Sequence, residues 1–287
     1  MVADTEDTQK AGGVAFDATV AHPARIYDYW LGGKDNFAAD RIAAEEVLTL
    51  MPSMAQVARQ VRMFLAAVVH HLAADAGIRQ FLDIGTGLPT VNNTHDVAQR
   101  AAPGARVVYV DNDPIVLLHA GALLTCSPPG RCAYIEADMR DPDRVLAGAA
   151  ATLDLTEPVA VMMLGLLHFL TDADAPYALT RYYLDALVPG SYLAVSHASS
   201  DIESEPLEAA AKRYNAHSAT PIILRSKAEI TPFFDGLDLI PPGITPLGQW
   251  APGAALPGSP GLPTYTALAR KPARRPNRPD VMKLDFL

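Results

Sequence analysis

The sequence has 287 residues, of which 49% are hydrophobic and 19% charged, and this composition excludes a disordered or fibrous chain. Its net charge of −9 argues against a nucleic-acid partner, because a phosphate backbone would be repelled. No apolar run reaches the roughly eighteen residues of a membrane span, and the N-terminus is not typical of a secretion signal. These features predict a cytoplasmic protein without a membrane partner.

The N-terminal quarter divides into two predicted segments. Residues 1–20 are small and polar and are expected to form a flexible leader. Residues 21–77 follow as a helical segment. In its second half, apolar residues recur at helical spacing from Val57 to Leu72, and Gly77 ends the pattern. This helix is expected to be part of the scaffold.

Short apolar runs then alternate with segments long enough for helices. Such alternation predicts a mostly parallel sheet with helices on both faces, the doubly wound α/β class. A helix is expected at 203–217, an irregular proline-rich excursion at 241–263 and a late strand at 264–269. Residues 272–287 are expected to be a loose basic tail. The five earlier strands are predicted at 81–84, 106–110, 132–135, 158–164 and 192–196.

The first of these strands leads into a glycine turn that contains Asp83, Gly85 and Gly87. In a doubly wound sheet, ligands bind at the carboxyl ends of the strands where the strand order reverses. Glycines at this place allow a tight turn and a close approach of the backbone to a ligand. An ordinary glycine turn without a ligand is the alternative.

Polar residues also follow the second and third strands. Asp111, with Asn112 beside it, stands where a carboxylate accepts hydrogen bonds from ribose hydroxyls, although it could instead cap the next helix. After the third strand, Asp138 could accept a hydrogen bond from an adenine amine, while Met139 covers the ring. The sequence therefore favours a nucleoside ligand that is held by three successive strand ends.

The end of the glycine turn argues against a dinucleotide. The dinucleotide pattern Gly-x-Gly-x-x-Gly requires a third glycine, but Pro89 and Thr90 occupy its last two positions. A nicotinamide-dependent dehydrogenase is therefore disfavoured. A nucleoside cofactor without phosphate would tolerate Pro89 at the start of a helix.

The histidines and cysteines do not predict a metal site. His70 and His71 are adjacent on a predicted helix and would point about 100° apart, and His95 has no further ligand at a suitable spacing. Cys126 and Cys132 lack a second pair of ligands and are expected to be structural thiols.

The ordered strand ends resemble the class I S-adenosylmethionine-dependent methyltransferases over roughly residues 78–200. Two stretches, HPARIYDYWLGGKDNFAADR at 22–41 and GTGLPTVNNTH at 85–95, resemble a bacterial S-adenosylmethionine methyltransferase family known mainly from actinomycetes. The resemblance implies a Rossmann-like, seven-stranded domain at 78–271 that binds S-adenosylmethionine and releases S-adenosylhomocysteine. It also implies that residues 21–77 form a helical lid over the cofactor.

The resemblance implies roles for individual residues as well. Arg25 or Lys34 in the lid could pair with the methionine carboxylate, although a surface helix with its aromatic residues packed inward is the alternative. His168, after the fourth strand, would take a proton from the acceptor, unless it is a hydrogen-bonded core residue; His197 is the second candidate base. The residues expected at the cofactor are Arg25, Tyr29, Asn36, Asp83, Gly85, Gly87, Asp111, Asn112, Asp138, Met139 and Leu164.

The expected function is methylation of an unidentified small molecule on oxygen or nitrogen. A non-catalytic module that binds a nucleoside or small molecule on the same fold is the alternative. The acceptor pocket is expected within 22–41, 163–177 and 197–225, with 241–263 as a further candidate segment; these segments contain Tyr177, Tyr214, His217 and Trp250.

Overall fold

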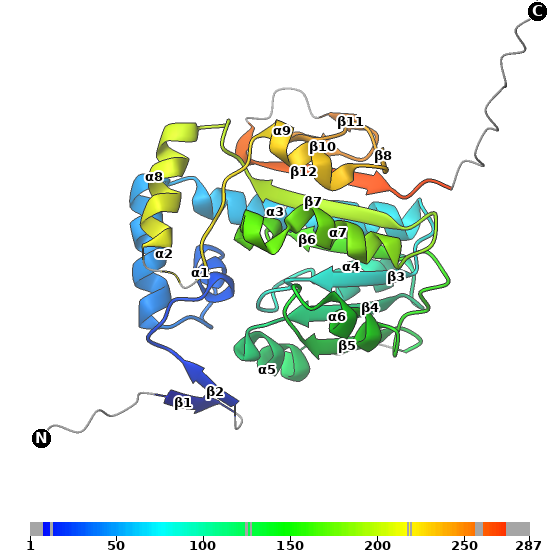
Figure 1. Ribbon diagram of the computed structural model, residues 1–287. Helices are drawn as coiled ribbons and strands as arrows, with labels where there is room; N and C mark the ends of the chain where they lie inside the picture. Colours follow the sequence, from blue (N-terminus) through cyan, green and yellow to red (C-terminus); the bar gives the residue numbers. More distant parts are fainter. Residues whose placement is uncertain are drawn as a thin grey trace, which may run out of the picture.

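The computed structural model describes residues 8–11, 14–123, 126, 128–216, 218, 220–255 and 261–273. Its centre is an eight-stranded sheet (Figure 1). The strands are β3 (Gln80–Ile84), β4 (Arg106–Asp111), β5 (Arg131–Glu136), β6 (Ala160–Leu164), β7 (Tyr192–Ala198), β8 (Asp238–Leu239), β9 (Thr245–Leu247) and β12 (Leu262–Arg270).

The strand order is β5-β4-β3-β6-β7-β12-β8, and β9 pairs with β12 outside this path. The neighbours from β5 to β7 are parallel, whereas β12 runs antiparallel to β7. The doubly wound fold and its late antiparallel strand are therefore confirmed, with β9 added to the seven strands expected. The chain leaves β3 toward β4 and β5 and returns to β6, so the strand order reverses between β3 and β6.

Helices cover both faces of this sheet. Every residue of β3 is buried, as expected for a parallel strand with helices on both sides. On one face, an apolar core joins the sheet to α3 (Met54–Ala74), α4 (Thr94–Ala101) and α5 (Pro114–Leu123). On the other face, a second apolar core joins it to α6 (Pro142–Ala149), α7 (Pro176–Asp185) and α9 (Lys227–Ile230).

A third core lies at one end of the molecule, where α1 (Pro23–Trp30), α2 (Ala38–Leu50) and α8 (Ser204–Asn215) pack together. Figure 1 shows these three helices side by side, although α8 follows α2 by more than a hundred residues. We call this group the cap. Residues 21–77, expected to form one lid, therefore belong to two parts of the fold: α1 and α2 join the cap, whereas most of α3 packs against the sheet.

The chain ends differ from expectation where they are described. Within the predicted leader, β1 (Thr8–Ala11) and β2 (Val14–Asp17) form an antiparallel hairpin. The proline-rich excursion contains β9 and a second hairpin of β10 (Trp250–Ala251) and β11 (Ala254–Ala255). The predicted basic tail lies outside the described residues from position 274 onward. Over the described part of the chain, no helix combines the length and apolar character needed to cross a membrane.

Candidate active site

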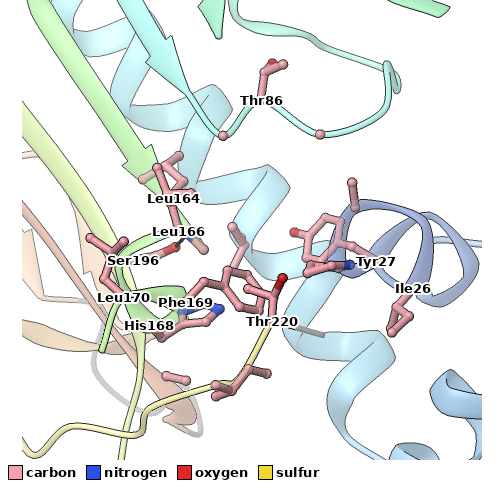
Figure 2. Close-up of a pocket in the computed structure, with 18 of the residues that line it drawn as sticks. Ile26, Tyr27, Thr86, Leu164, Leu166, His168, Phe169, Leu170, Ser196 and Thr220 are labelled. Carbon is pink, nitrogen blue, oxygen red and sulfur yellow. Dashed lines mark hydrogen bonds between the residues drawn. The ribbon is translucent and has the colours of Figure 1, made fainter. Parts of the chain in front are cut away.

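A cavity of about 240 Å³ lies at the carboxyl ends of the central strands and extends to the cap. This is the edge at which the strand order reverses, where doubly wound folds bind ligands. Figure 2 shows Thr86 of the glycine turn at one end of the cavity and Ile26 and Tyr27 of α1 at another side. Eight of the residues expected at the cofactor line it together: Asp83, Gly85, Gly87, Asp111, Asn112, Asp138, Met139 and Leu164.

The glycine turn after β3 needs its glycines for two physical reasons. Gly85 and Gly87 have φ of 71° and 65°, in the left-handed region that favours glycine. A Cβ atom on Gly85 would lie 2.6 Å from Cδ1 of Leu166, so either the Leu166 side chain or the turn would have to shift. The following helix, α4, begins at Thr94 rather than at Pro89, because Asn93 and Asp96 form its capping box.

Asp111 at the end of β4 ties the glycine turn to the neighbouring strand. Its Oδ2 accepts a hydrogen bond from the backbone N–H of Gly87 at 2.9 Å, and its Oδ1 accepts one from Asp113 at 3.0 Å. Burial raises the pKa of Asp111, and these two donors oppose the rise. The helix-capping role falls to Asp113, whose Oδ1 accepts from the N–H of Ile115. Each carboxylate oxygen of Asp111 retains a lone pair for a ligand hydroxyl.

Asp138 at the end of β5 belongs to a network that reaches the turn after β6. Its Oδ2 accepts hydrogen bonds from Nη1 of Arg140 at 2.9 Å and from Nδ2 of Asn112 at 3.4 Å. Arg140 also donates from Nε to Asp174 at 2.8 Å. Met139, between Asp138 and Arg140, is buried and lines the cavity.

Asp83 and Arg62 place opposite charges beside the glycine turn. Asp83 is buried and accepts a hydrogen bond from Oγ1 of Thr94 at 2.6 Å. Burial raises the pKa of Asp83 to about 6, although Thr94 and Arg62 oppose the rise. Arg62 lines the cavity, and its Nη2 donates to the carbonyl of Asn92 at 3.1 Å. Its buried Nε has no hydrogen-bond partner among the described residues. The helix α3, expected to be scaffold alone, therefore contributes a cation to the site.

Arg25 does not reach the cavity. It is 4% exposed, and its Nη2 donates to the carbonyl of Val20 at 3.0 Å. Its Nε lies 3.7 Å from Asp40 of α2 and 3.5 Å from Asp113. The geometry therefore gives Arg25 a role in joining the cap to the end of β4, in place of the expected cofactor contact.

The other lid residues expected at the cofactor also have partners outside the cavity. The Tyr29 hydroxyl donates to Glu45 of α2. Asn36 is buried and donates from Nδ2 to Asp28 at 2.8 Å. Lys34 is exposed and lies outside the cavity lining. The Tyr29 and Asn36 side chains stabilise the cap, whereas His22 at the N-cap of α1 and Tyr27 within α1 line the cavity.

His168 lies in the short 3-10 helix η1 (Leu167–Phe169) after β6 and lines the cavity (Figure 2). Among the described residues, no hydrogen bond reaches its buried Nδ1, so this ring nitrogen is not engaged by the core. Burial, followed by the charges of His197 and Arg225, holds the pKa of His168 well below its usual value. The imidazole is therefore neutral at pH 7 and able to accept a proton.

His197, the second candidate base, has a structural role instead. Its Nδ1 donates to the carbonyl of Ala198 at 2.8 Å, and its Nε2 accepts from Nη1 of Arg225 at 3.0 Å. Burial lowers the pKa of His197 to about 4. With both nitrogens engaged, His197 has no free site for a substrate proton.

Leu207, Ala210, Ala211 and Tyr214 form one stripe of α8, and all four line the cavity. Of these four, only Tyr214 was singled out from the sequence. Their i, i+3, i+4, i+7 spacing is a sequence signal for a buried helix face, but it does not reveal what the face covers. Of the residues expected at the acceptor, Tyr214 lines the cavity, Tyr177 and Trp250 do not, and His217 lies outside the described residues.

A cluster with ligand atoms lies near α4. One ligand atom from each of His95, Cys126 and Cys132 falls within 4.8 Å of the others, so the fold supplies partners that the sequence spacing of His95 did not suggest. The two cysteines, expected to be free thiols, are joined as a disulfide. Their sulfurs are therefore engaged with each other.

The strand order, the glycine turn and the acidic residues at the strand ends together define a Rossmann-like S-adenosylmethionine-dependent methyltransferase. The family model described as S-adenosyl methyltransferase matches residues 9–272. The chain therefore belongs to the S-adenosyl methyltransferase family, and it is a methyltransferase of the kind that uses S-adenosylmethionine.

Two solved structures are similar over most of their length. A DUF574 family protein from Streptomyces avermitilis MA-4680 is 45% identical and has a TM-score of 0.85; the alignment covers 89% of this chain and 99% of that one. A protein from Thermobifida fusca YX, described as a candidate methyltransferase, is 37% identical and has a TM-score of 0.81; the alignment covers 89% of this chain and 96% of that one. No curated protein matches the chain.

Proposed function

We propose that the protein transfers the methyl group of S-adenosylmethionine to an oxygen or nitrogen of a small molecule. One observation carries the proposal: a single cavity contains the three acidic strand ends, His168 and the apolar face of the cap. Such a cavity has room for a donor at the strand ends and an acceptor beside the cap.

The residues at the strand ends fit S-adenosylmethionine. Asp111 would accept hydrogen bonds from the ribose hydroxyls, and Asp138 and Met139 would face the adenine. Arg62, whose Nε lacks a partner, would pair with the methionine carboxylate. Asp83 would attract the methionine ammonium group. This assignment replaces Arg25, Tyr29 and Asn36, whose side chains are engaged elsewhere.

When bound, S-adenosylmethionine supplies a methyl group whose bond to the sulfonium breaks, with the electron pair left on sulfur, as an acceptor lone pair bonds to the carbon. The protein aligns the two molecules, because such a displacement depends chiefly on proximity and direction. If the acceptor atom carries a proton, His168 would take it at a ring nitrogen. The depressed pKa of His168 keeps the imidazole in the neutral form that this role requires.

A binding module without turnover is the second candidate. It is favoured by the surroundings of His168, where burial, followed by the charges of His197 and Arg225, lowers its pKa, and where no hydrogen bond reaches Nδ1 among the described residues. A weak base limits the chemistry to acceptors that lose a proton readily or need not lose one.

Labelled methyl transfer distinguishes these functions. The enzyme is incubated with methyl-labelled S-adenosylmethionine and fractions of a bacterial small-molecule extract, and transfer of the label and release of S-adenosylhomocysteine are measured. Methyl transfer predicts labelled product and S-adenosylhomocysteine in equal amounts. Binding of S-adenosylmethionine without any product in every fraction would support the binding module instead.

A further inference from the structure

The part of the cavity beside the cap differs in chemistry from the part at the strand ends. We call it the acceptor compartment and define it by six lining residues, Trp30, Val47, Leu207, Ala211, Tyr214 and Ile222. None of the six is charged, and the cap helices that carry most of them lie over the carboxyl ends of the strands (Figure 1). A charged acceptor placed here would lose its hydration without gaining an opposite charge.

The aromatic residues nearest this compartment present rings rather than polar atoms. The Tyr27 hydroxyl donates to the carbonyl of Ala58 at 2.9 Å, and Nε1 of Trp30 donates to the carbonyl of Ala44 at 3.3 Å. Both polar atoms are therefore engaged within the helices. Their ring surfaces suit a flat, apolar molecule, because aromatic rings favour stacked or edge contacts with other rings.

Tyr214 is the exception. Its hydroxyl is buried, and among the described residues it makes no hydrogen bond of normal distance and angle. The nearby Ser218 hydroxyl opposes the rise that burial causes in the pKa of Tyr214, but it donates its own proton to the carbonyl of Thr220 at 3.1 Å. The Tyr214 ring lies 6.4 Å from the ring of Phe169, the residue after His168. A buried tyrosine hydroxyl usually has a partner, so a ligand atom is the natural acceptor for it.

Taking methyl transfer as the function, we propose that the acceptor is an uncharged, ring-bearing hydroxyl compound. It would lie in the acceptor compartment with its hydroxyl toward His168, and a second oxygen would accept a hydrogen bond from Tyr214. The apolar walls select against ions, and the two polar side chains fix the orientation of the ring.

The test titrates three probes into the enzyme saturated with S-adenosylhomocysteine, whose own binding is measured first by calorimetry. The first probe is the uncharged 6-methoxy-2-naphthol. The second is 6-hydroxy-2-naphthoate, an anion with the same ring system, and the third is 2-naphthol, which lacks the second oxygen. We expect 6-methoxy-2-naphthol to bind with one-to-one stoichiometry and the anion to bind at least fiftyfold more weakly. Equal or tighter binding of the anion would overturn the proposal.

Two variants locate the probe. Ala211→Leu narrows the acceptor compartment and should weaken the binding of 6-methoxy-2-naphthol at least twentyfold. Ala209→Leu, on the exposed side of the same helix, should leave this binding unchanged. Tyr214→Phe should weaken the binding of 6-methoxy-2-naphthol about five- to tenfold and leave the binding of 2-naphthol unchanged. Unchanged binding of 6-methoxy-2-naphthol to both Ala211→Leu and Tyr214→Phe would place it elsewhere and overturn the proposal.

The titrations distinguish a wrong acceptor class from a wrong function. If S-adenosylhomocysteine binds and no naphthol does, the acceptor class is wrong while methyl transfer still stands. If S-adenosylhomocysteine itself does not bind, the proposed function fails, and the acceptor assignment fails with it.

Discussion

Arg62 and Asp83 set the charge balance beside the glycine turn. Arg62 brings a buried, unpartnered Nε to the cavity, and Asp83 brings a carboxyl group whose pKa burial raises to about 6. An amino acid moiety carries both a carboxylate and an ammonium group, so it complements this pair. The two side chains therefore make separate predictions about the methionine end of the cofactor.

Replacing Arg62 should weaken only ligands that have a carboxylate. We expect Arg62→Gln to raise the dissociation constant of S-adenosylhomocysteine about tenfold or more, because a charge-assisted hydrogen bond is lost. Binding of 5′-methylthioadenosine, which lacks the amino acid moiety, should not change. Arg59→Gln, at an exposed position of α3, is the control. Equal weakening of both ligands by Arg62→Gln would rule out the carboxylate contact.

The pKa of Asp83 predicts a pH dependence of binding. Only the ionised carboxyl group attracts an ammonium group, and protonation occurs as the pH falls through about 6. The dissociation constant of S-adenosylhomocysteine should therefore be constant from pH 8 to 7 and rise toward about tenfold per pH unit below 6. Calorimetry from pH 5 to 8 measures this. The same slope in Asp83→Asn would show that another group titrates.

At the scale of elements, the turn after β6 is held by Arg225. This buried side chain donates from Nη1 to the carbonyl of Leu167 at 3.1 Å and from Nη2 to the carbonyl of Leu170 at 2.9 Å. It also donates to His197. Arg225 thereby fixes the short helix that carries His168 without itself lining the cavity.

Removing this clamp should separate cofactor binding from catalysis. We expect Arg225→Met to lower stability by about 2 to 3 kcal/mol, because buried carbonyl groups lose their donor. It should also reduce methyl transfer while S-adenosylhomocysteine affinity stays within about threefold, since the charged residues assigned to the cofactor lie on α3, at the ends of β3 and β4 and after β5 rather than in this turn. Thermal melts and calorimetry test this, with the exposed Arg181→Met as control. An unchanged melting temperature of Arg225→Met would contradict the claim that Arg225 holds the turn after β6.

The glycine turn offers a second prediction at this scale. Gly85→Ala places a methyl group 2.6 Å from Cδ1 of Leu166 in a left-handed backbone conformation, so the backbone is strained and either the Leu166 side chain or the turn must shift. We expect a loss of at least about 1 kcal/mol in the free energy of unfolding and much weaker S-adenosylhomocysteine binding. Gly104→Ala, where a Cβ meets no atom within 4 Å, should change neither. Similar behaviour of the two variants would contradict the close-approach argument.

Over the whole molecule, local patterns predicted the sheet well. Each of the five early strands lies within two residues of its expected bounds at both ends, because buried parallel strands read as short apolar runs between turns. The residues at their carboxyl ends could be grouped from the sequence, since parallel strands bring such ends to one edge. Asp83, Asp111 and Asp138 all line the cavity for this reason.

The cap could not be predicted in the same way. Its core depends on α8 packing against α2, a long-range contact that neither helix encodes locally. The stripe through Tyr214 was visible, but its partner was not. Arg25 was expected to face the cofactor, yet the buried carboxylates of Asp40 in the cap and of Asp113 after β4 lie beside its guanidinium. Long-range pairing decided which polar side chains were left free for a ligand.

The most direct test of the cofactor site at the strand ends is the binding of S-adenosylhomocysteine to the wild-type enzyme and to Asp111→Asn, measured by calorimetry. We predict one site in the wild type and binding about 10- to 100-fold weaker in Asp111→Asn, because the amide loses the charge and one acceptor oxygen. Asp185→Asn, at an exposed position of α7, should bind as the wild type does. Equal affinity of the wild type and Asp111→Asn would contradict the claim that the ends of the parallel strands hold the nucleoside.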